Sequence, residues 1–149
     1  MVALFYLSVT FIDHSGHNIY FYQVCLISQS LWGTTDLADI SAPQRIVGYA
    51  QKQFGRGDGL VNNVACFPRN NLKSITTDVP DMLMAVNLRV PFISYKRAFD
   101  EIGPKTPSVT VVNIGAINAN CGQPDLLGYS LSKGALQTMT RNLAGAHAG

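Results

Sequence analysis

The stretch Tyr129-Ser130-Leu131-Ser132-Lys133 places a phenol and an amine four residues apart. On a helix, these two side chains lie on the same face. A cation beside a phenol favours the phenolate, and it lowers the phenol pKa from about 10 toward the working range of a general acid or base. Most Tyr and Lys pairs at this spacing are chance neighbours on a solvated face. The significance of the pair therefore depends on the rest of the chain.

Three further signals precede this pair. Asn62-Asn63-Val64-Ala65 follows an apolar stretch, Asn87 falls inside the next expected helix, and Val109 to Gly115 begins as a β-branched strand. Polar residues that follow parallel strands meet at the sheet edge where such sheets bind ligands. Taken alone, a strand-end Asn pair makes turns and a mid-helix Asn is more often a surface residue. In order and spacing, however, the whole series resembles the short-chain dehydrogenase/reductase family from about residue 36 to residue 144.

The resemblance implies a fold and an activity. The fold class is α/β, a partial doubly wound parallel sheet of Rossmann-like type, in a single domain over residues 1–149. The implied activity is NAD(P)-dependent interconversion of an alcohol and a ketone by hydride transfer. Tyr129 would be the proton donor and acceptor and would also contact the cofactor. Lys133 would lower the pKa of that phenol and hold the nicotinamide ribose, and the main chain of Asn87 would bind a water that relays protons to Lys133.

Cofactor-binding residues are expected at the ends of earlier strands. Asp13 ends the first expected strand, where a carboxylate can accept both adenosine-ribose hydroxyls and repel a 2′-phosphate; the alternative is a loop Asp that caps the next segment. By resemblance, Asp36 and Leu37 belong to an adenine-contacting pattern with two Asp residues three positions apart. Asn63, Val64 and Ala65 match a motif that lets the chain pass close to the cofactor. Because no Lys or Arg precedes residue 45, NAD is expected over NADP.

Two departures from the family pattern bear on activity. Ala116 stands thirteen residues before Tyr129, where the family has a Ser whose hydroxyl bonds the substrate carbonyl. Asn118 is the nearest alternative donor. No glycine precedes Asp13, so the Gly-rich turn that receives the pyrophosphate has no counterpart. We therefore expect a fold truncated at both ends, with activity impaired.

Composition limits the remaining possibilities. Hydrophobic residues make up 47% of the 149-residue chain and charged residues 13%, which suits a sheet covered on both faces. The net charge of +2, with no basic cluster, does not favour nucleic acid. Three cysteines without a C-x-x-C pair suggest free thiols in a reducing, cytoplasmic setting, and no metal site is expected. Residues 1–12 are apolar but too short to cross a bilayer. A buried strand is preferred there over a signal-like segment.

Hydrophobic periodicity and capping residues predict the elements. Strands are expected at 7–12, 31–35, 59–64 and 109–114, helices at 41–55, 78–99 and 126–144, and loops at 66–77 and 115–125, with 17–29 ambiguous between helix and strand. By resemblance, the helices at 79–99 and 126–144 would join two copies into a homo-oligomer. The sequence therefore leaves two functions open. One is an oxidoreductase acting on a small alcohol or ketone, and the other is a non-catalytic dimerising fragment of such a protein.

Overall fold

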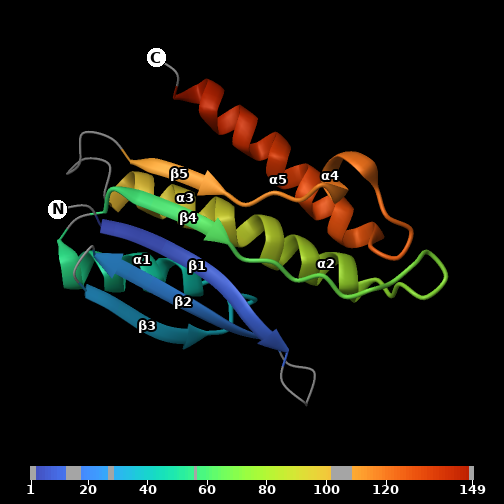
Figure 1. Ribbon diagram of the computed structural model, residues 1–149, viewed down its shortest axis with the longest axis horizontal. Helices are drawn as coiled ribbons and strands as arrows, with labels where there is room; N and C mark the ends of the chain where they lie inside the picture. The colour runs from blue at the N-terminus through green and yellow to red at the C-terminus, as the bar shows by residue number, and fades with distance from the viewer. Residues whose placement is uncertain (1–2, 13–17, 27–28, 56, 102–108, 148–149) are drawn as a thin grey trace.

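The computed structural model describes residues 3–12, 18–26, 29–55, 57–101 and 109–147 (Figure 1). The strands are β1 (Ala3–Ile12), β2 (Asn18–Leu26), β3 (Gln29–Thr35), β4 (Gly59–Asn63) and β5 (Thr110–Asn113). They form one sheet in the order β3-β2-β1-β4-β5. The helices are α1 (Ala42–Phe54), α2 (Asp78–Met84), the π-helical η1 (Ala85–Arg89), α3 (Val90–Glu101), α4 (Asn118–Cys121) and α5 (Leu127–Ala146).

The α/β class is confirmed, but the sheet is mixed rather than parallel throughout. β1, β4 and β5 run parallel, whereas β2 is antiparallel to both of its neighbours, β1 and β3. The segments between β1 and β2 and between β2 and β3 span 13–17 and 27–28. A parallel neighbour needs a crossover of a dozen or more residues, so links this short join antiparallel strands. The ambiguous region 17–29 is therefore largely strand β2.

Helix α1 agrees with its predicted caps. Ser41 occupies the N-cap position, and Gly55 closes the helix in the left-handed conformation (φ 70°), with its N–H donating to the Gln51 carbonyl at 2.8 Å. Glycine adopts this conformation without a steric cost. The buried face of α1 carries Ile46 and Val47, which belong to the same core cluster as residues from β4 and η1.

The long helix expected at 78–99 is divided into α2, η1 and α3. Its distortion falls at residues 85–89, just before Pro91, where the sequence predicts a bend. Pro91 has no N–H, so it cannot donate the α-helical hydrogen bond to the carbonyl of Asn87, four residues earlier. Single π turns of this kind are frequent at functional sites. The π turn is therefore centred on Asn87, which the sequence predicts to be a site residue.

The helices lie on one side of the sheet. In Figure 1, α1 and α3 pass behind the strands, and within the described residues no helix crosses the near face. Val112 in β5, the last of the described strands, is 43% exposed, and Ile114, just after that strand, is 42% exposed. The low charge of the chain suggests that both faces are covered, and for the described part of the molecule this expectation is wrong. No helix in the described part is long and apolar enough to cross a membrane.

Candidate active site

Lys133 joins the carboxyl ends of β4 and β5. Its side chain is 2% exposed, and Nζ donates to the carbonyl of Ile114 at 2.9 Å and to that of Val64 at 3.5 Å. Burial lowers the pKa of this amine to about 8, because the charged form loses its hydration. An ammonium has three donors, and two of them point at these carbonyls. One donor therefore remains for a ligand hydroxyl at the strand ends.

Tyr129 lies one turn before Lys133 on α5 and is half-buried. Lys133 Nζ lies 6.0 Å from the centre of the phenol ring. Burial raises the pKa of Tyr129 above its usual value. The sequence predicts the opposite direction, a pKa lowered by the neighbouring cation. Here Nζ is directed to the two carbonyls and its own charge is weakened by burial, so desolvation of the phenol dominates.

Asn87 clamps the loop after β4 to the helix that carries Tyr129. Its Oδ1 accepts from the Cys66 N–H at 2.6 Å, and its Nδ2 donates to the Cys66 carbonyl at 2.8 Å and to Ser132 Oγ at 2.9 Å. Ser132 Oγ in turn donates to the Tyr129 carbonyl at 2.8 Å. Asn87 and Ser132 are both fully buried. The predicted role of Asn87 involves its main chain, whereas its side chain performs this positioning.

A second polar chain ties β4, β5 and α5 together. Asn62 Nδ2 donates to Asn113 Oδ1 at 2.8 Å, and Asn113 Nδ2 donates to Thr140 Oγ1 at 3.0 Å. The Ile114 N–H donates to the Asn62 carbonyl at 2.9 Å, which extends the parallel pairing past β5. These contacts hold the two strand ends, and thus the two carbonyls that face Lys133, at fixed separation.

Ala116 follows β5 and carries no hydrogen-bonding side chain. It is half-buried and lines a cavity of about 210 Å³ together with Gly115, Lys133 and Gln137. Asn118, the alternative donor, lies in the short helix α4 within the segment predicted as a loop. Its Nδ2 donates to Gln123 Oε1 at 2.8 Å, so its amide is engaged locally. Position 116 therefore contributes no side-chain donor to this cavity.

The residues predicted to contact the cofactor fall into two groups. Asn63, Val64 and Ala65 lie at the carboxyl end of β4, and Val64 is 1% exposed with its side chain in the core cluster. The extra bulk of Val64 is therefore accommodated by the core. Asn63 and Ala65 are half-buried. These three residues lie at the carboxyl edge of the sheet, where Lys133 donates to the Val64 carbonyl.

The second group follows β3. Asp36 is exposed and its Oδ1 accepts from the Ala38 N–H at 2.8 Å, whereas Leu37 is buried. Asp39 is held by the Ser41 N–H at 2.9 Å and by Arg45 at 2.7 Å, and these bonds lower its pKa to about 2. The second carboxylate oxygen of Asp36 takes no part in the hydrogen bond from Ala38. Asp13, the predicted ribose carboxylate, lies outside the described residues.

Sequence reasoning missed two parts of the site. Ser132 enters it as a link between Asn87 and Tyr129, and Thr140 enters it as the anchor of Asn113. Ser132 is one residue before Lys133 and Thr140 is seven after it, on α5. Helical spacing could have indicated that Thr140 shares a face with Lys133. Within the described residues, no group of three or more metal-ligating side chains is found.

With this geometry in place, similarity to known proteins identifies the class. The family model described as short chain dehydrogenase matches residues 27–149, and the chain belongs to that family. The short-chain dehydrogenase/reductase FrzI of Cladobotryum sp is 37% identical over 103 residues, which cover 69% of this chain and 39% of FrzI. The chain thus spans less than half the length of this curated relative.

Two solved structures carry the similarity into three dimensions. The NADH-dependent reductase A1-R′ complexed with NAD has a TM-score of 0.71 and 25% identity, and the match covers 76% of this chain and 49% of that one. ElxO with NADP bound has a TM-score of 0.70 and 26% identity, with coverage of 76% and 46%. The neighbours thus include proteins that bind either nicotinamide cofactor.

Proposed function

We propose that this chain carries the proton-handling part of an NAD(P)-dependent oxidoreductase that interconverts a small alcohol and a ketone. The observation that carries the proposal is the Lys133 amine, buried at the ends of β4 and β5 beside Tyr129, with a pKa of about 8. A group that titrates near working pH can exchange protons with its surroundings during turnover. Family membership and the cofactor-bound structural neighbours support the same reaction class.

The residues present suit a nicotinamide cofactor at the carboxyl edge. The remaining Lys133 donor suits a ribose hydroxyl, and Asn63, Val64 and Ala65 would border the cofactor on the β4 side. Asp36 and Leu37 would border its adenine. When bound, the cofactor supplies or accepts the hydride. The phenol of Tyr129 gives its proton to the carbonyl oxygen during reduction and takes it back during oxidation. The nearby Lys133 ammonium stabilises the phenolate that remains after the proton has left.

Ala116 limits the rate of this chemistry. In the proposed reaction the Tyr129 phenol donates to the substrate oxygen, and Ala116 adds no second side-chain donor there. Loss of one preorganised donor at such a position costs roughly 10²–10³ in rate. We therefore expect slow turnover from this chain, and restoration of a hydroxyl should increase it.

The proposed reaction is tested by cofactor binding and by turnover. NADH fluorescence should report binding to the purified chain, and absorbance at 340 nm should report slow ketone reduction. Ala116→Ser should raise that rate at least tenfold, and Tyr129→Phe should reduce it below detection. Tyr49→Phe, which alters a surface phenol on α1, is the matched control and should have no effect. A chain that binds neither NADH nor NADPH would contradict the proposal.

The cofactor preference is a finer proposal. Asp13 would place a carboxylate against the 2′-phosphate of NADP, and no Lys or Arg lies within the first 44 residues to offset it. NADH should therefore bind more tightly than NADPH, and Asp13→Ala should narrow the difference. Equal affinities before substitution would contradict the role of Asp13. We place this chemistry in the cytoplasm, in keeping with the free thiol of Cys121.

A second candidate function is a non-catalytic dimerising module. An apolar groove of about 570 Å³ runs between the α2–η1–α3 helix and α5, and Met84, Leu88, Phe92 and Met139 line it. These are the helices predicted to join two copies, and the missing hydroxyl at Ala116 also favours this candidate. Sedimentation should show a homo-oligomer that Met139→Lys dissociates, with Thr138→Lys, an exposed neighbour, as the control. A wild-type monomer would contradict the module.

A further inference from the structure

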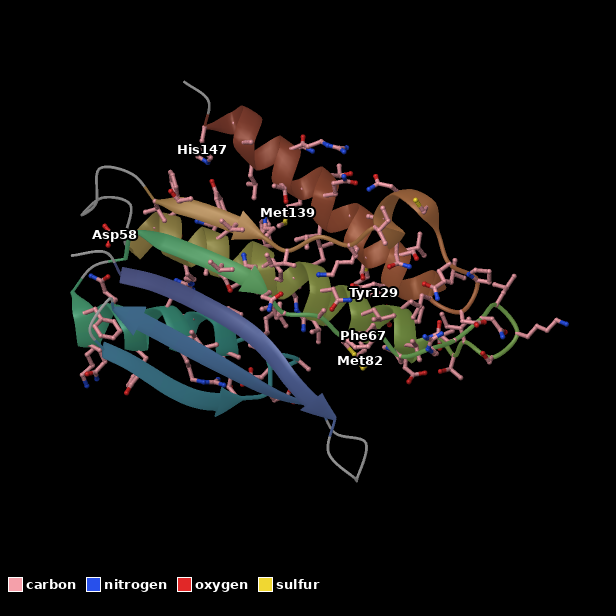
Figure 2. The ribbon with its side chains drawn as sticks, viewed as in Figure 1. Asp58, Phe67, Met82, Tyr129, Met139 and His147 are labelled. Atoms are coloured by element: carbon pink, nitrogen blue, oxygen red, sulfur yellow. The ribbon has the colours of Figure 1, made fainter. Side chains whose placement is uncertain are left out.

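Phe67 is a large apolar side chain left exposed beside Tyr129. It is 62% exposed. Its ring centre lies 6.0 Å from that of Tyr129, with the ring planes at 63° in an edge-to-face arrangement (Figure 2). Such a pair is attractive in itself. One face of Phe67 is nonetheless left in water beside the phenol, where burial of that face by an apolar ligand would be favourable.

The segment that carries Phe67 is anchored on both sides. Before it, both backbone groups of Cys66 are bonded to the Asn87 side chain. After it, the Asn70 N–H donates to the Asp125 carbonyl at 2.8 Å, and the Asn70 amide donates to the Pro68 carbonyl at 3.1 Å. Pro68 also restricts the backbone of Phe67. The phenyl ring is therefore presented from a fixed backbone rather than from a loosely held loop.

The same clamp sets the position of both rings. Asn87 fixes Cys66, which is adjacent to Phe67, and through Ser132 it fixes the backbone of Tyr129. A ligand group that contacts Phe67 would therefore lie at a defined place relative to the phenol. Preorganised apolar walls of this kind select ligands by shape with little loss of conformational entropy.

We infer that Phe67 is a specificity-determining wall of the substrate site, and that it selects ketones and alcohols with a phenyl group next to the reacting carbon. The inference rests on the proposed function for the identity of the reacting group. Edge-to-face contact with Tyr129 leaves the exposed face of Phe67 for a second ring, so that an aryl substituent extends the aromatic pair. A short alkyl substituent would gain much less from the same surface.

The test compares two probe ketones by ligand-observed NMR on the full chain without cofactor. Acetophenone should bind more tightly than butan-2-one. Phe67→Ala should weaken acetophenone roughly tenfold, the order expected when most of a phenyl contact is removed, and should change butan-2-one less than twofold. Phe67→Tyr keeps the ring and should retain acetophenone affinity. Phe99→Ala removes another half-exposed Phe that stacks on a tyrosine, Tyr95 at 6.3 Å, and should leave both affinities unchanged.

Each outcome separates this inference from the proposed function. Equal binding of both ketones, no binding of either, or an unchanged ratio in Phe67→Ala overturns the role of Phe67, even if the chain binds NADH. A loss of NADH affinity in Phe67→Ala with the ketone ratio intact also overturns it, since the ring would then contact the cofactor. Conversely, aryl selectivity that depends on Phe67 without NADH binding supports the wall and contradicts the oxidoreductase. Circular dichroism of Phe67→Tyr and Phe67→Ala checks that both variants fold.

Discussion

The carboxyl ends of β4 and β5 both contact Lys133, but the residues around the two ends make different interactions. Beyond β4, Asn87 makes three hydrogen bonds of 2.6–2.9 Å that fix Cys66 and the Tyr129 helix. Beyond β5, Gly115 and Ala116 border a cavity of about 210 Å³ and offer no side-chain donor. The β4 side therefore has the contacts that position the proposed proton donor, Tyr129. The β5 side has no side-chain donor at position 116, where the proposed reaction would need one.

The largest effect should come from breaking the β4 side. Asn87→Ala removes the partners of the Cys66 N–H, the Cys66 carbonyl and Ser132 Oγ in a fully buried setting. Unpaired buried groups cost about 1–3 kcal/mol each, so we expect a loss of about 3 kcal/mol or more in the free energy of unfolding. Urea denaturation measures it. Asn118→Ala, which removes one bond near the surface on the β5 side, should cost under about 1 kcal/mol. Equal losses would contradict the asymmetry.

A second prediction tests the packing beneath Tyr129. A Cβ at Gly128 would lie 2.6 Å from Leu83 Cδ1, and Leu83 is fully buried on α2. Gly128→Ala should therefore destabilise the protein by about 1–3 kcal/mol through overpacking. The matched control is Gly134→Ala on the same helix, whose Cβ would meet nothing closer than the Ala119 carbonyl at 3.9 Å. That change should stabilise by up to about 1 kcal/mol through helix propensity. Thermal melts of both variants decide the sign of each.

The residue shared by both strand ends gives a pH-dependent effect. The folded state lowers the pKa of Lys133 to about 8 from 10.5, so above pH 8 the unfolded chain binds more protons than the folded one. Unfolding free energy should therefore rise from pH 8 to 10, by at most about 1.4 kcal/mol per pH unit. Above pH 10 the raised pKa of Tyr129 acts in the opposite direction. Lys133→Met should remove the rise, as measured by urea titrations between pH 7 and 10. A rise that persists in this variant would assign it to another group.

The smallest effect on stability should come from the β5 side. Ala116→Ser adds one hydroxyl at a half-buried position on the rim of a cavity, where water can satisfy it. We expect a change within about 0.5 kcal/mol in the free energy of unfolding, the range of ordinary surface substitutions. Differential scanning calorimetry is sensitive enough to detect a larger one. A loss above 1 kcal/mol would show that position 116 is packed more tightly than its partial exposure indicates.

The sequence predicts the core of the site because its signals are local. Tyr129 and Lys133 share a helix face, and the apolar runs at 59–64 and 109–114 place the two Asn-bearing strand ends side by side. The Asn87–Cys66 clamp spans 21 residues and the Asn87–Ser132 bond spans 45. No local pattern specifies partners at such separations. β2 runs antiparallel to its neighbours because the links on either side of it are short. The sequence does not predict this direction, because residues 17–29 are ambiguous between helix and strand and the ends of the links are therefore not defined.

The direction of the Tyr129 pKa shift shows a different limit. Sequence spacing correctly places a cation one helical turn from the phenol. It does not show that Nζ is directed to the carbonyls of Ile114 and Val64, or that burial outweighs the charge. Whether burial or a neighbouring charge controls the pKa of a side chain depends on distances and solvent access. Both of these follow from tertiary packing.

The π turn at 85–89 also changes the phase of the helix that contains it. An α-helix advances about 100° per residue, and a turn that takes in one residue more rotates everything after it by about that angle. Around this turn the neighbour of the helix changes, since α2 and η1 contact α5 whereas α3 contacts α1. Deleting a single residue from this turn would restore the regular winding, and it would also turn one half of the helix away from its present neighbour.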